Sequence, residues 1–343
     1  MRKTGFIALS ALLLIIAESS AAEMSGASFL KEEPGARALA LGSAATALAD
    51  DINSLAVNPG GLNFFVSPEG SALYTKGMLD SYYSYIAYVL PCGKSGTFGA
   101  SFLLYNGGSA DITGSSGTST VNAETDMVLS LAYGINITDT LGCGAAVKFI
   151  TSSLAQDYHA LAAAADIGLL YRPFDGKCSF GLALQNIGTK LVYISQGDAL
   201  PFTVRGGASF KVRENSTESW LVAGDLVYLD NCLRYDLGVE AVLFKILSLR
   251  AGYKFNNNPD VFTFGAGFEI FQARIDYAYC PTGELDYTQR LSIGFKFDAP
   301  SAYSTAVEYC KKGLKEKALD ILKGIPKTNS EYFLARALMK KLN

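Results

Sequence analysis

The chain has 343 residues, of which 49% are hydrophobic and only 18% are charged, and its formal net charge is −3. Soluble domains carry about 25% charged residues, so this chain is unusually apolar. The absence of a basic surplus argues against a nucleic-acid partner, and the absence of G-X-Y and heptad periods excludes collagen and coiled coil.

Residues 1–22 have the form of a secretory signal peptide. Two basic residues precede an apolar run from Phe6 to Ala17, and small residues end the segment at Ala22. A membrane anchor is the alternative, but the run is shorter than the roughly 20 residues that a spanning helix needs. We therefore expect cleavage after Ala22 and export from the cytoplasm.

The remaining chain divides by composition into three zones, which we expect to be separate structural units. Residues 23–66 are rich in small side chains, and residues 67–297 are punctuated by tyrosine and glycine. Residues 298–343 change character, because this stretch holds nine basic and five acidic residues.

The middle zone, residues 67–297, alternates apolar and polar residues with a period of two. Between Leu233 and Ala241 every odd position is apolar and every even position is polar or Gly, which is the pattern of a strand with one apolar face. The same template predicts strands at 69–77, 81–91, 95–106, 122–135, 139–152, 158–172, 177–187, 202–212, 218–229, 233–243, 246–256, 261–270, 271–280 and 287–297.

About fourteen strands of this length predict an all-β transmembrane barrel with antiparallel strands. Short connections alternate with longer ones at 107–121, 188–201 and 281–286, and an outer-membrane barrel has short turns on one rim and long loops on the other. A soluble β-sandwich is the alternative. It would expose many Lys and Glu, whereas here Tyr and Phe gather on the apolar faces near strand ends.

The polar faces carry charges of both signs, and we expect them to line the lumen. Arg or Lys facing lipid near the midplane would cost about 2–4 kcal/mol each. These charges would brace the wall or anchor a plug. The residues are Arg234, Asp236, Glu240, Arg250, Lys254, Glu269, Arg274, Asp276, Arg290 and Lys296.

Several motifs together resemble the PorV/PorQ family of outer-membrane proteins and, more distantly, the FadL long-chain fatty-acid transporters. They are Gly35–Ala44, Ala49-Asp50-Asp51, Val57-Asn58-Pro59-Gly60-Gly61-Leu62, Gly168–Pro173, Leu184–Gly188, Pro201–Arg205 and the last hairpin from Asp276 to Phe297. Two features depart from the family. Gly60 stands where Ala is usual, and the chain continues 46 residues beyond Phe297, where a barrel ordinarily ends.

The resemblance implies a fourteen-stranded FadL-like barrel with an N-terminal plug in residues 23–66. Asn58 can bond its own backbone and Pro59 fixes a turn, which fits a compact segment inside a narrow space. Arg37, Asp50 and Asp51 are the candidate anchors on the plug side. An ordinary helix capped before the first strand is the alternative.

The tail, residues 298–343, predicts short helices. Apolar residues recur at helical spacing from Ser301, Gly313 interrupts them, and Gly324 to Pro326 end a second segment. The turn at Gly313 to Leu319 resembles that of a tetratricopeptide (TPR) repeat, and a plain helical hairpin is the alternative. Its apolar stripe, formed by Tyr303, Val307, Leu319, Leu322 and Leu334, is a candidate docking face for a partner.

Catalytic, cofactor and metal motifs are missing from the sequence. His159 lies in a strand pattern without a nearby nucleophile motif, and we expect it to be structural. Asp50-Asp51 lacks further acidic ligands and is expected to cap a helix or to pair with Arg37. The six cysteines show no C-x-x-C spacing, so their pairing stays open.

We therefore expect a non-enzymatic barrel in the bacterial outer membrane, in contact with its lipid, with both mature termini periplasmic. Its lumen would bind or pass a hydrophobic or extended guest, as FadL-like transporters do. A PorV-like adaptor that receives exported proteins for type IX secretion is the second hypothesis. A structural barrel that docks a periplasmic or secretion-machine protein through residues 301–343 is the third.

Overall fold

The computed structural model describes residues 25–48, 50–77, 80–114, 117–155, 157–215, 217–256, 261–281, 287–297, 302–311, 313–325 and 332–342. The expected signal peptide, residues 1–22, lies outside the described residues, and so do Glu23 and Asn343. Among the described helices, none is long and apolar enough to cross a membrane.

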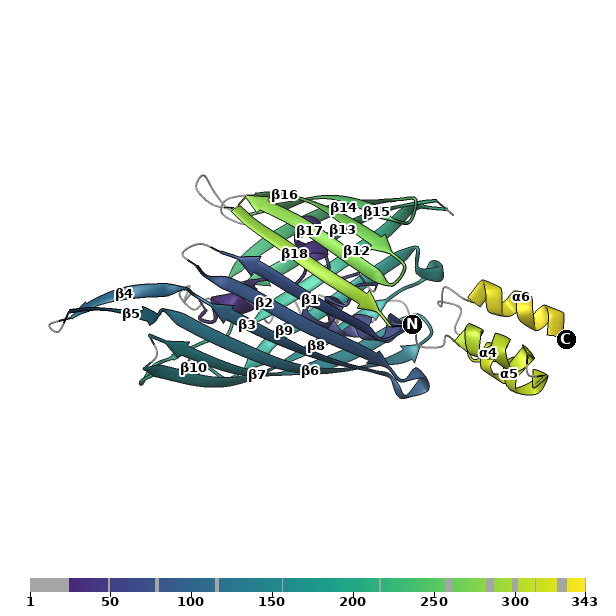
Figure 1. Cartoon of the computed structure of the whole chain (residues 1–343), viewed down its shortest axis with the longest axis horizontal. Helices are drawn as coiled ribbons and strands as arrows, with labels where there is room; N and C mark the ends of the chain where they lie inside the picture. Colours follow the sequence, from purple (N-terminus) through teal and green to yellow (C-terminus); the bar gives the residue numbers. More distant parts are fainter. Residues whose placement is uncertain are drawn as a thin grey trace, which may run out of the picture.

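Fourteen antiparallel strands close into one barrel (Figure 1). Glu69 pairs with Lys296 and Tyr74 with Leu291, so the first strand closes the sheet against the last. The strands are β1 (Glu69–Lys76), β2 (Tyr82–Pro91), β3 (Thr97–Asn106), β6 (Glu124–Thr138), β7 (Leu141–Leu154), β8 (Tyr158–Tyr171), β9 (Cys178–Gly188), β12 (Thr203–Glu214), β13 (Glu218–Leu229), β14 (Cys232–Leu243), β15 (Leu247–Phe255), β16 (Val261–Ile270), β17 (Ala273–Pro281) and β18 (Tyr287–Lys296).

The fourteen-stranded antiparallel barrel predicted from the sequence is confirmed, and each predicted strand boundary lies within three residues of the observed one. Two segments predicted as loops contain further strands. Residues 107–121 hold a hairpin of β4 (Ser109–Gly114) and β5 (Gly117–Asn122), and residues 188–201 hold β10 (Leu191–Val192) and β11 (Gly197–Asp198). The β4–β5 hairpin has exposed Ser and Thr on both faces, so it lacks the apolar alternation that marks a barrel strand.

Both hairpins lie at the same end of the barrel, which we call the hairpin rim. The opposite end, where β1 begins and β18 ends, is the tail rim. Its turns are all short and include the 3-10 helices η3 (Gly93–Ser95) and η4 (Phe174–Gly176). The hairpin rim also has short turns, at 155–157 between β7 and β8 and at Asp230 and Asn231 between β13 and β14.

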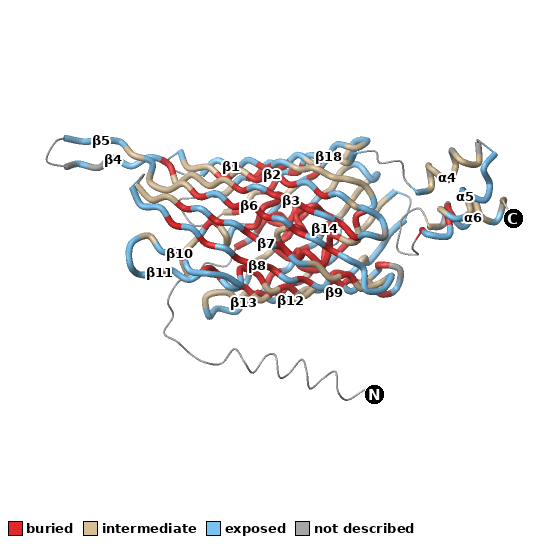
Figure 2. Tube along the Cα trace, turned by 90° about the horizontal axis from the view of Figure 1, so that it is seen from below, coloured by how far each residue is buried: buried red, intermediate tan, exposed pale blue. Residues whose placement is uncertain are grey.

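The two faces of each strand differ in exposure, as Figure 2 shows. In β6, Leu129 and Leu131 are 44% and 48% exposed, whereas Val128 and Ser130, which alternate with them, are buried. Exposed aromatic rings pair toward both rims: Phe262 with Phe264 at a centroid distance of 6.4 Å, and Phe295 with Phe297 at 5.1 Å. The outer surface is thus an apolar band with aromatic ends, which is the surface that lipid requires of a barrel.

The tail forms three helices, α4 (Ala302–Lys311), α5 (Lys315–Lys323) and α6 (Tyr332–Leu342). They share a small core of their own, made of Ala306, Ala318, Leu322, Ile325 and Ala335. Leu322, expected on an exposed stripe, is buried in this core, and Tyr303 packs against it. Three short helices bury part of the stripe against one another, which sequence spacing does not show. The TPR-like character of the tail stays a prediction.

Because the tail has its own core, the barrel should not depend on it. We expect truncation after Phe297 to leave membrane insertion unchanged, and the truncated barrel should keep the heat-dependent shift in gel migration that folded barrels show. A truncated protein that fails to insert would show instead that the tail belongs to the barrel fold.

Candidate functional site

Residues 25–66, the luminal segment, run lengthwise through the barrel. At the hairpin rim Ser25 Oγ donates a hydrogen bond to Asp230 (2.6 Å), and at the tail rim the segment leads into β1. Its helices are η1 (Ser28–Lys31), α2 (Ala36–Ala40), α3 (Ser54–Val57) and η2 (Pro59–Phe64), and together they contact strands around most of the wall.

The path of this segment bears on the expected topology of the termini. Both mature termini were expected on one side, and Glu23 and Asn343 themselves lie outside the described residues. Ser25 lies against Asp230 at the hairpin rim, whereas β18 ends at the tail rim. An even number of strands requires only that the two ends of the sheet, Glu69 and Lys296, lie at the same rim. Because the luminal segment crosses the lumen before the first strand, Ser25 lies at the other rim, and the side on which the termini lie stays a prediction.

Ten inward-facing glycines on nine strands receive the luminal segment, and we call them the glycine seats. A Cβ added at any of them would lie closer than 3.0 Å to an atom of the segment, a separation that real Cβ atoms do not show. At Gly252 it would lie 2.0 Å from the Gly42 nitrogen, and at Gly144 it would lie 2.2 Å from the Pro59 oxygen. The seats are Gly99, Gly134, Gly142, Gly144, Gly168, Gly181, Gly207, Gly238, Gly252 and Gly265.

The plug-motif residues Asn58, Pro59 and Gly60 lie against β8 in this close contact. Asn58 Oδ1 accepts a hydrogen bond from Gly60 N (3.0 Å), and its Nδ2 donates to the carbonyl oxygens of Thr46 and Leu169. A Cβ on Gly60 would lie 2.8 Å from the Leu169 carbonyl carbon. The contact therefore explains why this chain has Gly where the resembling family usually has Ala.

A closed cycle of buried charges, the charge ring, fastens the luminal segment to the wall. The ring alternates Arg37, Glu240, Arg250, Asp276, Arg274 and Asp51. Arg37 binds Glu240 through two nitrogens, at 2.9 and 2.7 Å, and also contacts Asp50 at 2.9 Å. Such bidentate pairs fix orientation as well as distance.

Both Asp50 and Asp51, which the sequence offered as a helix cap or a partner of Arg37, contact Arg37. Asp51 Oδ1 also accepts a hydrogen bond from Asn53 N (2.9 Å) just before α3. In the described chain, no group of three or more His, Cys, Asp or Glu side chains is placed to hold a metal ion.

A second set of charges holds the part of the segment nearer the hairpin rim. Arg205 of β12 binds Glu33 at 2.7 Å and reaches Asp225 at 3.4 Å, while Asp225 accepts hydrogen bonds from Thr46 N and Oγ1. Glu33 therefore holds the segment to the wall through its ion pair with Arg205.

The ten charges expected in the lumen all lie on the inner faces of their strands, in alternation with exposed residues. Some reach the luminal segment and others brace only the wall. Arg234, Glu240, Arg274 and Arg290 contact the segment directly. Lys296 instead pairs with Glu269 at 2.7 Å near the tail rim.

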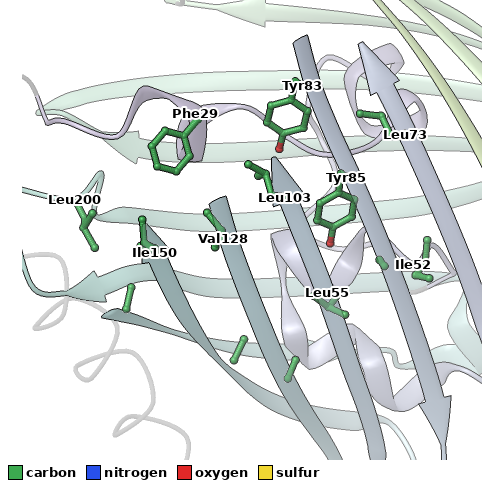
Figure 3. Packing of buried hydrophobic residues seen from close by; sticks show 14 of the residues in the cluster. Phe29, Ile52, Leu55, Leu73, Tyr83, Tyr85, Leu103, Val128, Ile150 and Leu200 are labelled. Atoms are coloured by element: carbon green, nitrogen blue, oxygen red, sulfur yellow. The ribbon is translucent and has the colours of Figure 1, made fainter. Parts of the chain in front are cut away.

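The opposite half of the lumen, lined by β2, β3, β6, β7 and β8, is mainly apolar, and we call it the apolar chamber. Figure 3 shows the side chains that meet there, including Phe29 of the luminal segment. Its described lining includes Tyr83, Tyr85, Leu103, Val128, Ile150, Ala160, Ala162 and Ala164, with Leu191 and Leu200 at the hairpin rim.

A cavity of about 60 Å³ adjoins the chamber, between residues 30–34 and the wall. Leu103 and Val128 line both the cavity and the chamber. Pockets that enclose drug-sized ligands measure about 300–1,000 Å³, so this cavity alone is too small to hold one. A guest of that size could enter this cavity only if the residues that line it move.

His159 and the cysteines lie outside this site. His159 is exposed on β8, and its Nδ1 is 2.7 Å from Ser153 Oγ across the β7–β8 pair, which fits the structural role expected. All six cysteines are free thiols. Neither Phe29 nor the glycine seats as a group could be recognised from the sequence. One sequence signal could have indicated the apolar chamber: the run from Ala162 to Ala165 is apolar on both faces of β8.

The barrel is similar to three solved transporters. It matches the Ralstonia pickettii toluene transporter TbuX with a TM-score of 0.56 at 14% sequence identity, over 77% of this chain and 98% of that one. It matches the P. putida toluene transporter TodX with 0.56 at 12%, over 77% and 99%. The CymD monoaromatic hydrocarbon channel gives 0.54 at 12%, over 77% and 98%.

No protein-family model matches the sequence, and no curated protein matches it. At these identities the structural likeness shows the fold alone, which is the FadL-like barrel expected from the motifs. The finer resemblance to PorV/PorQ stays a prediction.

The glycine seats generate the first prediction for this site. We expect Gly252→Ala to destabilise the barrel by about 1–3 kcal/mol, the usual range for overpacking a filled interior. Gly206→Ala is the matched control, because a Cβ there meets no atom within 4 Å. The temperature at which the folded gel band disappears should fall for Gly252→Ala only. Equal temperatures for the two variants would mean that the seat is not tightly filled.

The charge ring leads to the second prediction for this site. Arg274→Glu places a third acid beside Asp51 and Asp276, and breaking a buried pair costs about 3–5 kcal/mol. We expect the segment to loosen and the conductance in planar bilayers to rise. Lys296→Glu, which disturbs a wall-only pair, should leave conductance near the wild-type level. An Arg274→Glu barrel that is folded but no more conductive would restrict the ring to bracing the wall.

Proposed function

We propose that the protein is a bacterial outer-membrane barrel that admits a small hydrophobic compound into the apolar chamber. The observation that carries this proposal is the chamber itself. Beside buried polar residues such as Ser101, Asp126 and Ser130, its inner wall carries many Leu, Val, Ile and Ala side chains, whereas a barrel lumen is ordinarily polar. The similar barrels TbuX and TodX are toluene transporters and CymD is a monoaromatic hydrocarbon channel, which supports a guest of this class.

The hairpin rim would face the exterior and the tail rim the periplasm. Outer-membrane barrels have short periplasmic turns and longer outer loops, and the β4–β5 hairpin is the longest excursion among the described residues. The tail would then be periplasmic and residues 25–31 would lie at the outer entrance. The guest would meet the chamber directly below that entrance.

Residues 36–66 would act as a fixed plug. They fill the glycine seats and carry two members of the charge ring, Arg37 and Asp51. A motion large enough to open a straight path would break these contacts together. Charged and polar solutes would therefore be excluded, while an apolar guest would occupy only the chamber on one side of the plug.

The tail supports a second role, in which the barrel docks a periplasmic protein, as a PorV-like secretion adaptor would. The helices α4 to α6 have their own core and the segment carries a basic surplus, neither of which a plain channel requires. Truncation after Phe297 should then abolish co-purification of a periplasmic protein while uptake continues. Co-purification that is unchanged by the truncation would contradict a docking role for the tail.

Filling the chamber tests the main proposal. We expect Ala162→Trp to reduce uptake of radiolabelled toluene by cells that produce the protein, because Ala162 is buried in the chamber wall. Leu161→Trp is the matched control, since Leu161 is 75% exposed on the outer face of the same strand. Uptake that is unaffected by Ala162→Trp, or that never exceeds the level of cells without the protein, would contradict the proposal.

A further inference from the structure

The wall of the apolar chamber is arranged in rows, because β2, β3, β6, β7 and β8 pair in register. The row nearer the hairpin rim, which we call the outer row, consists of Tyr83, Tyr105, Asp126, Ser152 and Ala160. The middle row, displaced by two residues on each strand and visible in part in Figure 3, consists of Tyr85, Leu103, Val128, Ile150 and Ala162. A polar row of the wall therefore adjoins a mainly apolar one.

Asp126 of the outer row is buried with an incomplete set of hydrogen bonds. Its side chain is 0% exposed, and its Oδ1 accepts a hydrogen bond from Ser152 Oγ. Ser152 Oγ also lies 2.7 Å from Tyr193 Oη, and because the Ser152 proton goes to Asp126, the Tyr193 hydroxyl donates to Ser152. Asp126 Oδ2 has no hydrogen-bond partner among the described residues. The chain of donors from Tyr193 thus ends at a carboxyl group with one free oxygen.

The other buried acid of the chamber, Asp166, shows what a complete set of partners looks like. Its Oδ2 lies 2.7 Å from Lys148 Nζ, and its Oδ1 accepts a hydrogen bond from Asn186 N at 2.7 Å. Lys148 is held there, because it also donates to Asn186 Oδ1 at 2.7 Å. Glu124, two residues before Asp126 on the same face of β6, is itself an acid. A buried oxygen without a partner costs free energy, so a guest that supplies one gains affinity.

We propose that Asp126 Oδ2 binds a hydroxyl group of the guest, so that the chamber selects a small phenol over the hydrocarbon of the same shape. The inference rests on the proposed uptake of a hydrophobic compound. The ring of the guest lies against the middle row, which is roughly 6–7 Å from the outer row along the strand. A ring hydroxyl and one hydrogen bond bridge this distance to Asp126. A plain hydrocarbon would leave Oδ2 without a partner.

A hydroxyl group fits this oxygen better than the other polar groups that a small guest can carry. A hydroxyl both donates and accepts, so it pairs with Oδ2 whether the carboxyl group of Asp126 is ionised or protonated. A ketone only accepts and needs the protonated acid, whereas an ammonium group only donates and needs the ionised one. A carboxylate would be repelled by Glu124 and Asp126. The class of guest is therefore a neutral compound with one hydroxyl group.

Binding of 4-fluorophenol and 4-fluorotoluene to the full-length protein in lipid nanodiscs tests the inference, with fluorine NMR as the readout and empty discs as the blank. The wild type should bind 4-fluorophenol at least about tenfold more tightly, because a site built to bond a hydroxyl discriminates against the analogue that lacks it. Asp126→Leu should abolish this preference, whereas Asp126→Asn should keep part of it, because an amide also bonds a hydroxyl. Asp111→Leu, the same exchange at an exposed acid of β4, should keep the wild-type preference.

Equal binding of the two compounds by the wild type, which requires no folded variant, would overturn the inference while leaving the proposed uptake standing. A preference for 4-fluorophenol that survives Asp126→Leu would also overturn it, because another group would then bind the hydroxyl. Tighter binding of 4-fluorobenzylammonium than of 4-fluorophenol would do the same, because Asp126 would then be a counter-ion. Absence of binding of both compounds would overturn it too, and the proposed function would fall with it only if toluene uptake is also absent.

Discussion

The close approach of one chain segment to the inner wall determines how this barrel is built. Residues 40–63 meet the wall at positions where even a methyl group has no room, and these positions are distributed over nine strands. A segment in such contact cannot be threaded into a closed barrel, so the sheet has to close around it. The charge ring then adds direction, because Arg37 and Asp51 meet the wall at a fixed rotation and height.

Given this fixed core, the lumen divides into two halves with different chemistry. Strands β12 to β18 supply most of the inner charges, and their pairs hold the luminal segment. Strands β2 to β8 supply the apolar chamber, in which Lys148 and Asp166 pair at 2.7 Å and both also bond Asn186 of β9. Anchoring and guest binding therefore use different strands.

Much of the fold follows from local pattern, because a strand that separates lipid from a filled lumen must alternate. The alternation predicted all fourteen barrel strands and the inner face of Arg250 and Asp276. It could not predict the β4–β5 hairpin, because both faces of that hairpin are exposed to solvent. It also could not predict the rim at which Ser25 lies, because this depends on the path of the segment through the lumen. In the sequence, Gly238 and Gly252 are recognisable only as glycines at strand positions that are otherwise polar. Their contacts at Leu41 and Gly42 lie about 200 residues away in sequence, and no local period encodes them.

Hydrogen exchange of backbone amides in the intact, membrane-embedded barrel tests the central claim that the glycine seats and the charge ring fix the luminal segment in place. The account predicts that amides in residues 36–66 exchange as slowly as those of β6 and β7. Exchange in residues 36–66 as fast as in the exposed β4–β5 hairpin would contradict it.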